Sequence, residues 1–296
     1  MKVLTVDIDG TYIRYACMDE FMNISKRGKI FTPQEGRKAL IETVGRLFDV
    51  MGDVEGIAVS MPGIIDSEKG YCAMGGALRY NDDFYFRDAL YERCKTKIYV
   101  ENNAKCAAMA EAALGSLADV EDSFLLIFST MIGGACIRDH KLYKGKHFAA
   151  GEVSYTIINT IDKLKDENLW GRSFGIPKLL QHYAALKELD IETVDLLTIF
   201  DAVQNSEPEA VSCLQWYSKE IAVRIFNLQT VLDVERFSIG GELAKYPAFM
   251  ESLRVHLEKL YSECPFKLPQ AQIVASKFYH DANLIGALQC WLAEMF

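Results

Sequence analysis

Short apolar segments with the two-residue period of strands alternate along the chain with segments of helical spacing. Residues 2–10 alternate between apolar and polar positions and end in the Asp-Gly turn at 9–10, which predicts a strand. Residues 11–19 and 24–32 predict two further strands of the same hairpin array. Residues 33–52 predict a helix, because their apolar positions recur at helical spacing, most clearly at Leu40, Val44, Leu47 and Phe48.

Single strands then alternate with helices. Residues 54–66 predict a buried strand that ends in a Pro-Gly turn, and residues 96–102 predict the next strand. Residues 103–115 predict an Ala-rich helix, for which Gly115 is a suitable end. This alternation is typical of an α/β domain.

A second cycle begins at residue 123. Residues 123–145 predict strand, turn, strand and turn, which resembles the start of the chain in pattern and indicates a duplicated architecture. The remaining segments predict three helices, a strand, a helix, a strand and a closing helix, at 176–189, 193–204, 209–232, 235–244, 249–263, 271–278 and 281–296. No low-complexity linker separates the halves. We therefore expect two α/β domains, one of residues 1–115 with the closing helix at 282–296, the other of residues 116–281.

Composition narrows the class of protein. Of the 296 residues, 50% are hydrophobic and 25% are charged, a balance typical of globular proteins with a large core. The net charge of −9 without a basic cluster argues against nucleic acid and anionic membranes as partners. No apolar run approaches the ~20 residues that span a bilayer. Asp7 and Asp9 interrupt the first apolar run, so it is no signal peptide, and we expect a cytoplasmic protein.

The cysteines and histidines show no metal-binding pattern. None of the eight cysteines forms a C-x-x-C pair, and most of them lie in apolar segments, so we expect buried, reduced thiols. The five histidines are scattered along the chain. A structural zinc ion is therefore not expected.

Two kinds of segment carry candidate chemistry. The first is the polar junction Glu101-Asn102-Asn103, where a predicted strand meets a predicted helix. The second is a set of three glycine turns, each after a buried strand, at 7–11, 129–135 and 238–243. Glycine turns let backbone N–H groups approach a phosphate, but they also join strands in many proteins. From the residues alone, the three turns could bind phosphate or could simply join strands.

Several of these motifs together resemble the ROK family of sugar kinases and related repressors. The resemblance covers the whole chain and rests on "VDIDGTYIRYA", "GIAVSMPGIID", "YVENNAKCAAMAE", "STMIGGACIRDHKLYKGKHFAAGEV" and "FSIGGEL". It implies the two-domain actin-like, hexokinase-like (ribonuclease H-like) fold with a cleft between the domains. "GGALRYNDDF" and "GEVSY" resemble the zinc-free branch that includes bacterial β-glucoside kinases. No DNA-binding helix-turn-helix precedes the first strand, so we do not expect a repressor.

The resemblance also implies roles for individual residues. In this family ATP lies between the domains, the sugar lies against the smaller one, and phosphate passes to the sugar 6-hydroxyl. The phosphate and nucleotide positions match Asp7, which would lie near Mg²⁺, and Asp9, Gly10, Thr11, Thr130, Gly133, Gly134, Gly240 and Gly241. The sugar positions match Gly76, Arg79, Asn102, Asn103, Glu152 and Tyr155. Members commonly form dimers through the larger domain, and the resemblance leaves a homodimer open for this chain.

The chain departs from the family at the catalytic base. The family motif resembles Glu-Asn-Asp-Ala, and its Asp accepts the proton of the sugar hydroxyl, whereas Asn103 stands there in this chain. A carboxamide can hold the hydroxyl but cannot act as a general base, and such a base is typically worth ~10²–10⁴-fold in rate. The other interpretation of Asn103 is a helix N-cap, a position that Asn favours.

Further departures lie in the phosphate motifs and the sugar motif. Asp9 replaces a Gly, and its charge would repel a phosphate, bind Mg²⁺, or cap a turn that faces water. Met131 also replaces a Gly, and would either fill the phosphate channel or turn into the core. Tyr155 stands where many members have His. Arg79 and Asp82 are either contacts that set sugar specificity or parts of a solvated loop.

These features together predict a ROK-family sugar kinase homologue with impaired phosphate transfer. Binding of ATP and Mg²⁺ follows from the resemblance, and Asp9 and Met131 count against it. The alternatives are a fully active hexose or glycoside kinase and a non-catalytic sugar-binding protein of kinase ancestry.

Overall fold

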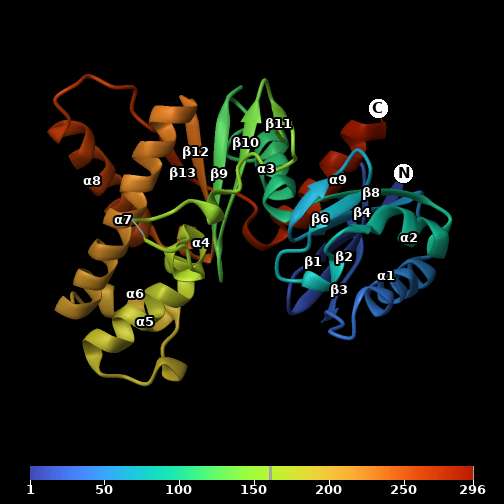
Figure 1. Cartoon of the computed structure of the whole chain (residues 1–296), viewed down its shortest axis with the longest axis horizontal. Helices are drawn as coiled ribbons and strands as arrows, with labels where there is room; N and C mark the ends of the chain where they lie inside the picture. The colour runs from blue at the N-terminus through green and yellow to red at the C-terminus, as the bar shows by residue number, and fades with distance from the viewer. Residues whose placement is uncertain (160–161, 296) are drawn as a thin grey trace. The chain divides into compact units, whose positions relative to one another are not determined.

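The computed structural model describes residues 1–159 and 162–295 and divides the chain into two compact units (Figure 1). Unit 1 comprises Met1–Ala118, Ala135–Ala150 and His280–Phe296, and unit 2 comprises Asp119–Gly134 and Gly151–Tyr279. Each unit contains helices and strands of a five-stranded sheet. The predicted fold class of two α/β domains is therefore confirmed, and the residue ranges expected for them stay a prediction.

The sheet of unit 1 has the strand order β3-β2-β1-β4-β8. β1 pairs antiparallel with β2, and β2 pairs antiparallel with β3, while β1, β4 and β8 run parallel. Their bounds are β1 Lys2–Ile8, β2 Tyr12–Asp19, β3 Ile24–Phe31, β4 Gly56–Met61 and β8 Lys97–Asn102. Because β1, β4 and β8 are parallel, β4 and β8 end at one edge of the sheet beside the end of β1, where Asp7 lies.

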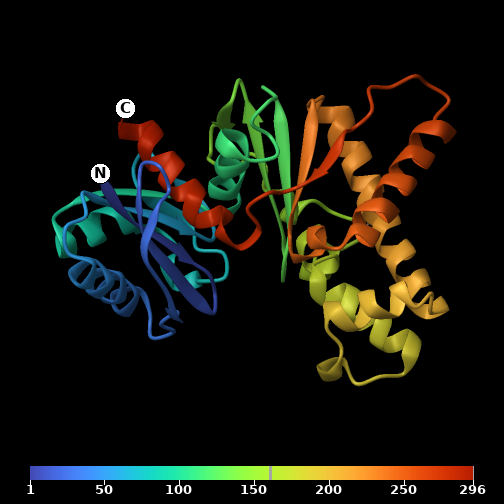
Figure 2. The same cartoon turned by 180° about the vertical axis from the view of Figure 1, so that it is seen from behind.

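Helices cover both faces of this sheet. α1 (Arg37–Met51) and α2 (Phe86–Cys94) pack on the face that includes Leu4 and Val6. α3 (Asn103–Leu114) and α9 (Ala282–Met295) pack on the opposite face, which includes Val3 (Figure 2). α3 and α9 lie very close together, since a Cβ atom added at Gly286 would lie 1.6 Å from the carbonyl oxygen of Cys106.

A small antiparallel sheet follows β4 in unit 1. It consists of β5 (Ile64–Asp66), β6 (Tyr71–Met74) and β7 (Phe84–Tyr85), and the 3₁₀ helix Arg79–Asn81 lies between its last two strands. The sequence pattern predicted neither this sheet nor α2.

The second five-stranded sheet has the order β11-β10-β9-β12-β13. Its strands are β9 Ser123–Phe128, β10 Ile132–Arg138, β11 Lys141–Tyr143, β12 Arg236–Gly241 and β13 Ile273–Ala275. In both sheets the first strand pairs with the second, the second with the third, and two later strands extend the other edge. The strand order therefore supports the predicted duplication.

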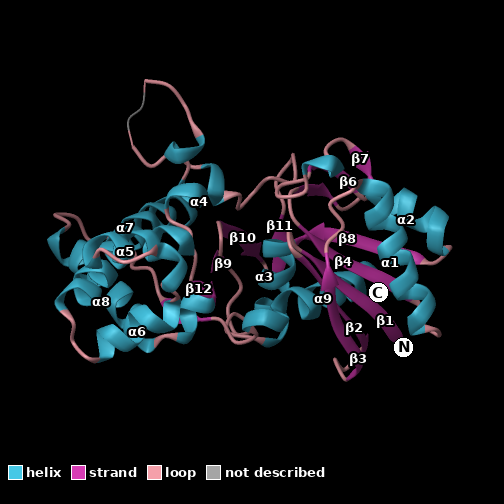
Figure 3. Ribbon diagram, turned by 90° about the horizontal axis from the view of Figure 1, so that it is seen from below, coloured by secondary structure: helices cyan, strands magenta, loops and turns pink. Residues whose placement is uncertain are grey.

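Apart from β9, β12, β13 and the start of β10, unit 2 is mainly helical (Figure 3). Its helices are α4 Trp170–Ser173, α5 Ile176–Lys187, α6 Leu196–Gln204, α7 Pro208–Leu232 and α8 Pro247–Glu263, with short 3₁₀ helices at Val153–Tyr155, Asp166–Asn168, Ile191–Thr193 and Glu242–Lys245. A further 3₁₀ helix, Tyr279–Asp281, precedes α9. α7 is the longest of them and packs against α5, α6 and α8.

Six of the eight cysteines are buried, as expected from the apolar segments that contain them. Within residues 1–159 and 162–295, no helix is long and apolar enough to cross a membrane.

Candidate functional site

Asn102 connects β8 to α3. It is the last residue of the strand and the N-cap of the helix, and its Oδ1 accepts the N–H of Lys105 at 3.1 Å. Its Nδ2 donates to the carbonyl oxygen of Gly63 at 2.7 Å, and the residue is only 4% exposed. The alternative interpretation of Asn103 as the N-cap is therefore wrong, because Asn102 occupies that position.

Asn103 is the first residue of α3 and is half-buried. Its Oδ1 accepts the N–H of the next residue, Ala104, at 2.8 Å. Within the described part of the chain its side chain makes no other hydrogen bond, so the fold does not depend on this carboxamide as a cap.

A buried ion pair holds the end of β8. Glu101 has no exposed surface, and its two carboxylate oxygens accept the N–H of Asn102 at 2.8 Å and the Nζ of Lys144 at 3.0 Å. Lys144 also donates to Ser67 and to the hydroxyl of Tyr99. Burial lowers the pKa of Lys144, but the Glu101 carboxylate raises it, and the net result is a raised pKa. Lys144 therefore stays charged at neutral pH, and its contact with Glu101 fixes the backbone that presents Asn102.

Lys105 provides a second connection from α3 to the segment that follows β11. Its side chain is 1% exposed, and its Nζ donates to the carbonyl oxygen of Phe148 at 3.0 Å. Lys105 and Lys144 thus attach residues 144–148 to the β8–α3 junction from two sides. This segment leads along the chain directly to Gly151 and Glu152.

Close contacts at two glycines place the loop that contains Gly76, a predicted sugar-binding position, near Asn102. A Cβ atom added at Gly76 would lie 3.0 Å from the nitrogen of Gly63, the residue that accepts a hydrogen bond from Asn102. A Cβ atom added at Gly10 would lie 3.3 Å from the Cβ of Ala77. Asn102, Gly76 and Gly10, predicted from three separate motifs, therefore lie close together in unit 1.

Arg79 and Asp82 shape this loop. Asp82 accepts the N–H of Gly75 at 2.7 Å and the guanidinium of Arg79 at 2.6 Å. Arg79 holds the pKa of the Asp82 carboxyl below its usual range, and the hydrogen bond from Gly75 lowers it further. The Arg79 side chain is 74% exposed, so most of it stays accessible to a ligand.

The turn between β1 and β2 is built around Asp9. Its Oδ1 accepts hydrogen bonds from the N–H groups of Thr11 and Tyr12, both at 2.7 Å, and its Oδ2 accepts one from the guanidinium of Arg14 at 3.0 Å. Of the three interpretations of Asp9, the hydrogen bonds support the turn cap, but the carboxylate pairs with Arg14 and is only 35% exposed to water. The amides that could meet a phosphate at this turn already bind a carboxylate, so the turn as it stands does not fit a phosphate.

Asp7 lies at the end of β1 with almost no exposed surface. It accepts hydrogen bonds from Ser60 at 2.9 Å, from Asn283 at 2.9 Å and from Arg14 at 3.3 Å. Burial raises its pKa above the ordinary value, although Asn283, Ser60 and Arg14 act in the opposite direction. Asp7 is thus a buried carboxyl group with three polar partners among the residues that the structure describes.

The hairpin between β9 and β10 contains the second glycine turn. Thr130 is exposed and Met131 is half-buried, so Met131 does not turn fully into the core. The turn packs against the start of α5, where the N–H of Ile176 donates to the carbonyl oxygen of Ser129 at 2.8 Å. A Cβ atom added at Gly175 would lie 2.2 Å from the carbonyl oxygen of Thr130. The turn is therefore held in place from the α5 side.

Close packing accounts for several glycines of unit 2. A Cβ atom at Gly241, where φ is +85°, would lie 2.0 Å from the carbonyl oxygen of Phe128 on the neighbouring strand. One at Gly134 would lie 2.7 Å from the carbonyl oxygen of Gly151. Gly133 and Gly240 belong to β10 and β12. These contacts support the structural interpretation of the glycines and do not test a role in nucleotide binding.

Gly151 and Glu152 lead into the 3₁₀ helix Val153–Tyr155. Glu152 is half-buried and Tyr155 is 44% exposed, so both side chains are accessible within unit 2. Their assignment to sugar binding stays a prediction.

The sequence motifs did not indicate Arg14, Asn283 or Lys144. The sequence could have indicated Arg14, because the first two predicted strands form a hairpin in which Asp7 pairs directly with Arg14. Asn283 and Lys144 lie far from Asp7 and Glu101 in sequence, so no local pattern could relate them.

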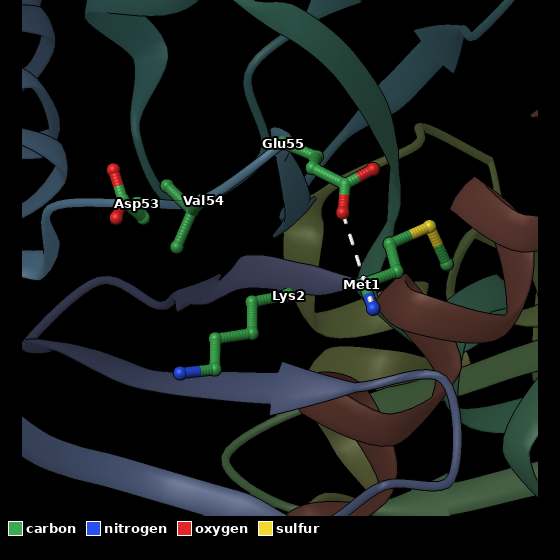
Figure 4. A pocket seen from close by; sticks show the side chains of 5 residues that line it. All are labelled: Met1, Lys2, Asp53, Val54 and Glu55. Atoms are coloured by element: carbon green, nitrogen blue, oxygen red, sulfur yellow. Dashed lines mark ion pairs between the residues drawn. The ribbon is translucent and has the colours of Figure 1, made fainter.

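A surface pocket lies at the amino terminus, lined by Met1, Lys2, Asp53, Val54 and Glu55 (Figure 4). The α-amino group of Met1 pairs with Glu55 at 3.9 Å there. None of the predicted site residues lines this pocket. Among the described residues, no group of three or more His, Cys, Asp or Glu side chains is placed to hold a metal ion.

Comparison with known proteins matches residues 3–294 to the model of the ROK family. The β-glucoside kinase of Listeria monocytogenes is 28% identical over 297 residues, which cover 99% of this chain and 98% of that protein. The solved structure of the Lmo2764 protein from the same species has a TM-score of 0.90 at 25% identity, covering 100% of both chains. A ROK family protein from Streptococcus pneumoniae, solved in complex with sucrose, has a TM-score of 0.87 at 25% identity and covers 100% of this chain and 99% of that one.

Proposed function

This chain belongs to the ROK family, and we propose that it binds a hexose or a glycoside and that its transfer of phosphate from ATP to the sugar is impaired. A relative that aligns over nearly the whole chain is a β-glucoside kinase, and a similar structure contains sucrose. In unit 1, Asn102, Gly76 and the β1–β2 turn lie together, which supports a common role in ligand binding.

The observation that carries the proposal is the geometry of Asn103. Asn102 already serves as the N-cap of α3, so the fold does not need Asn103 for that purpose. Asn103 therefore presents a carboxamide at the position of the family's catalytic carboxylate. A carboxamide accepts a hydrogen bond from a sugar hydroxyl but does not take up its proton at neutral pH. The sugar is held, and the proton acceptor is missing.

A second candidate function is that of a fully active glycoside kinase. The name of the Listeria relative favours it, because that protein aligns with 99% of this chain. Sugar phosphorylation without a carboxylate base would then depend on water as the proton acceptor. The two candidates differ in turnover rather than in sugar binding.

Calorimetric titration with glucose, cellobiose, sucrose and an aryl β-glucoside tests the first part of the proposal. We expect heat of binding for at least one of these sugars. Release of ADP in the presence of that sugar, ATP and Mg²⁺ tests the second part, and we expect slow release. Rapid turnover would contradict impairment and favour the second candidate, whereas the absence of binding to any of the four sugars would contradict both.

A further inference from the structure

The β1–β2 turn already binds an anion, and that anion is its own side chain. Two backbone N–H groups, of Thr11 and Tyr12, converge on one carboxylate oxygen of Asp9 at 2.7 Å each. Consecutive amides that point at one anionic oxygen form the same arrangement that backbone nests use for phosphate oxygens. The turn therefore has the geometry of an anion site, with its donors in use.

Arg14 holds the carboxylate in this position. Its guanidinium donates to Asp9 at 3.0 Å and to the buried Asp7 at 3.3 Å, so it bridges the two carboxyl groups. The side chains of Arg14 and Asp9 are 34% and 35% exposed. A ligand can therefore reach this pair without unfolding of the sheet.

The backbone of the turn does not depend on the carboxylate alone. Thr32 donates its hydroxyl hydrogen to the carbonyl oxygen of Asp9 at 2.8 Å, and Gln34 donates to the carbonyl oxygen of Gly10 at 3.1 Å. The N–H of Asp9 also donates to the carbonyl oxygen of Tyr12 at 2.9 Å. These bonds would keep the two amides in place if the Asp9 side chain were removed.

We infer that Asp9 is an internal competitor for the phosphate of a nucleotide at the β1–β2 turn, and that it lowers the affinity of this chain for that ligand. The inference rests on the proposed function, because it takes the ligand of this turn to be a nucleoside triphosphate. A phosphate enters only when the Asp9 carboxylate releases Thr11 and Tyr12. The apparent affinity is then reduced by the small fraction of molecules in which the turn is open.

A role of Asp9 in folding alone predicts a different result. Aspartates often cap turns, and Asp19 does so at the other end of β2, where its Oδ1 accepts the N–H groups of Phe21 and Asn23 at 3.0 and 2.8 Å. Removal of a mere cap lowers stability and leaves ligand affinity unchanged. Removal of a competitor raises ligand affinity. Asp19 is therefore a matched control on the same strand.

The test is calorimetric titration of the full chain and its Asp9→Ala, Asp9→Asn and Asp19→Ala variants with the ATP analogue AMPPNP and Mg²⁺, and separately with inorganic pyrophosphate. We expect Asp9→Ala to bind AMPPNP at least ~10-fold more tightly than the unchanged chain, a factor that corresponds to about 1.4 kcal/mol. Asp9→Asn keeps an acceptor oxygen but loses the charge, so its gain is expected to be smaller. Asp19→Ala should bind as the unchanged chain does.

Equal or weaker binding by Asp9→Ala overturns the inference, and weaker binding only in the presence of Mg²⁺ assigns Asp9 to the metal instead. Should Asp9→Ala fail to fold, as circular dichroism would show, the absence of any gain in Asp9→Asn overturns it equally. Titration of the same variants with the sugars reports on the proposed function independently. A result that overturns the inference can therefore be distinguished from a failure of the proposed sugar binding.

Discussion

Replacing Lys144 with methionine removes the cation beside the buried carboxylate of Glu101. The Nζ of Lys144 lies 3.0 Å from a Glu101 oxygen, and Glu101 has no exposed surface. Methionine has a similar length and no charge, so the substitution nearly preserves the packing of the aliphatic part of the Lys144 side chain. Among the described residues, Glu101 would then keep the hydroxyl of Tyr99 and the N–H of Asn102 as partners.

The size of the effect follows from these contacts. Breaking a buried ion pair by removing one partner typically costs about 3–5 kcal/mol of unfolding free energy. The Lys144 side chain is 26% exposed, and Glu101 retains two hydrogen bonds, so we expect the lower end of that range, about 3 kcal/mol. Because Glu101 accepts the N–H of Asn102, we also expect weaker sugar binding by Lys144→Met.

Urea unfolding followed by circular dichroism measures the loss. The double variant Lys144→Met/Glu101→Gln should recover part of it, since glutamine has no charge to leave unpaired. Lys95→Met is the control, because Lys95 pairs with Glu92 at 2.6 Å but both side chains are well exposed, at 60% and 73%. Equal losses for Lys144→Met and Lys95→Met would refute the assignment of Lys144 as the counter-charge of Glu101.

Two further predictions concern buried polar groups of unit 1. Asn81 is fully buried, and neither end of its carboxamide has a hydrogen-bond partner within the described residues. Asn81→Leu should therefore raise the unfolding free energy by about 1 kcal/mol in the same urea assay. A loss of stability would show that the carboxamide has hydrogen-bond partners in solution. The raised pKa of Asp7 means that the folded chain binds a proton at this carboxyl more tightly than the unfolded chain does. The resulting gain in unfolding free energy is complete below the pKa of the unfolded chain and is lost as the pH rises through the pKa of the folded chain. The stability of the unchanged chain should therefore fall relative to Asp7→Asn as the pH rises above 3.8, the ordinary pKa of an aspartate, and a difference independent of pH would contradict the raised pKa.

The sequence predicted the strands of the two large sheets and most helices, because their apolar periods are strong. β1, β2 and β3 match the predicted segments within two residues at each end. α1 begins at Arg37 rather than at residue 33, since Gly36 precedes it with φ +119°. α2 was not predicted, because only Phe86 and Leu90 of its nine residues are buried and its periodicity is correspondingly weak.

The candidate site could be predicted only in part. The sequence identified Asn102, Gly76 and the β1–β2 turn, which the structure brings together. It could not decide which of two adjacent asparagines caps α3, because both have the same side chain. It also could not decide between the turn cap and a ligand role for Asp9, since that choice depends on the positions of the Thr11 and Tyr12 amides and of Arg14.

The other predictions from the family resemblance concern the larger assembly and the remaining site residues. A homodimer stays open, and a cytoplasmic location and the nucleotide roles of Thr130, Gly133, Gly134, Gly240 and Gly241 stay predictions. So do the sugar contacts of Glu152 and Tyr155.

The central claim is that Asn103 holds a sugar at the position where a catalytic carboxylate is missing. The most direct measurement is the rate of ATP-dependent phosphorylation of a sugar that binds, compared between the unchanged chain and Asn103→Asp, with Asn205→Asp as a control for the same change on an exposed residue of unit 2. A restored base should raise the rate by up to ~10²–10⁴-fold while sugar affinity stays similar, and Asn205→Asp should have no effect. Rapid phosphorylation by the unchanged chain, with no gain or a loss in Asn103→Asp, would contradict the account.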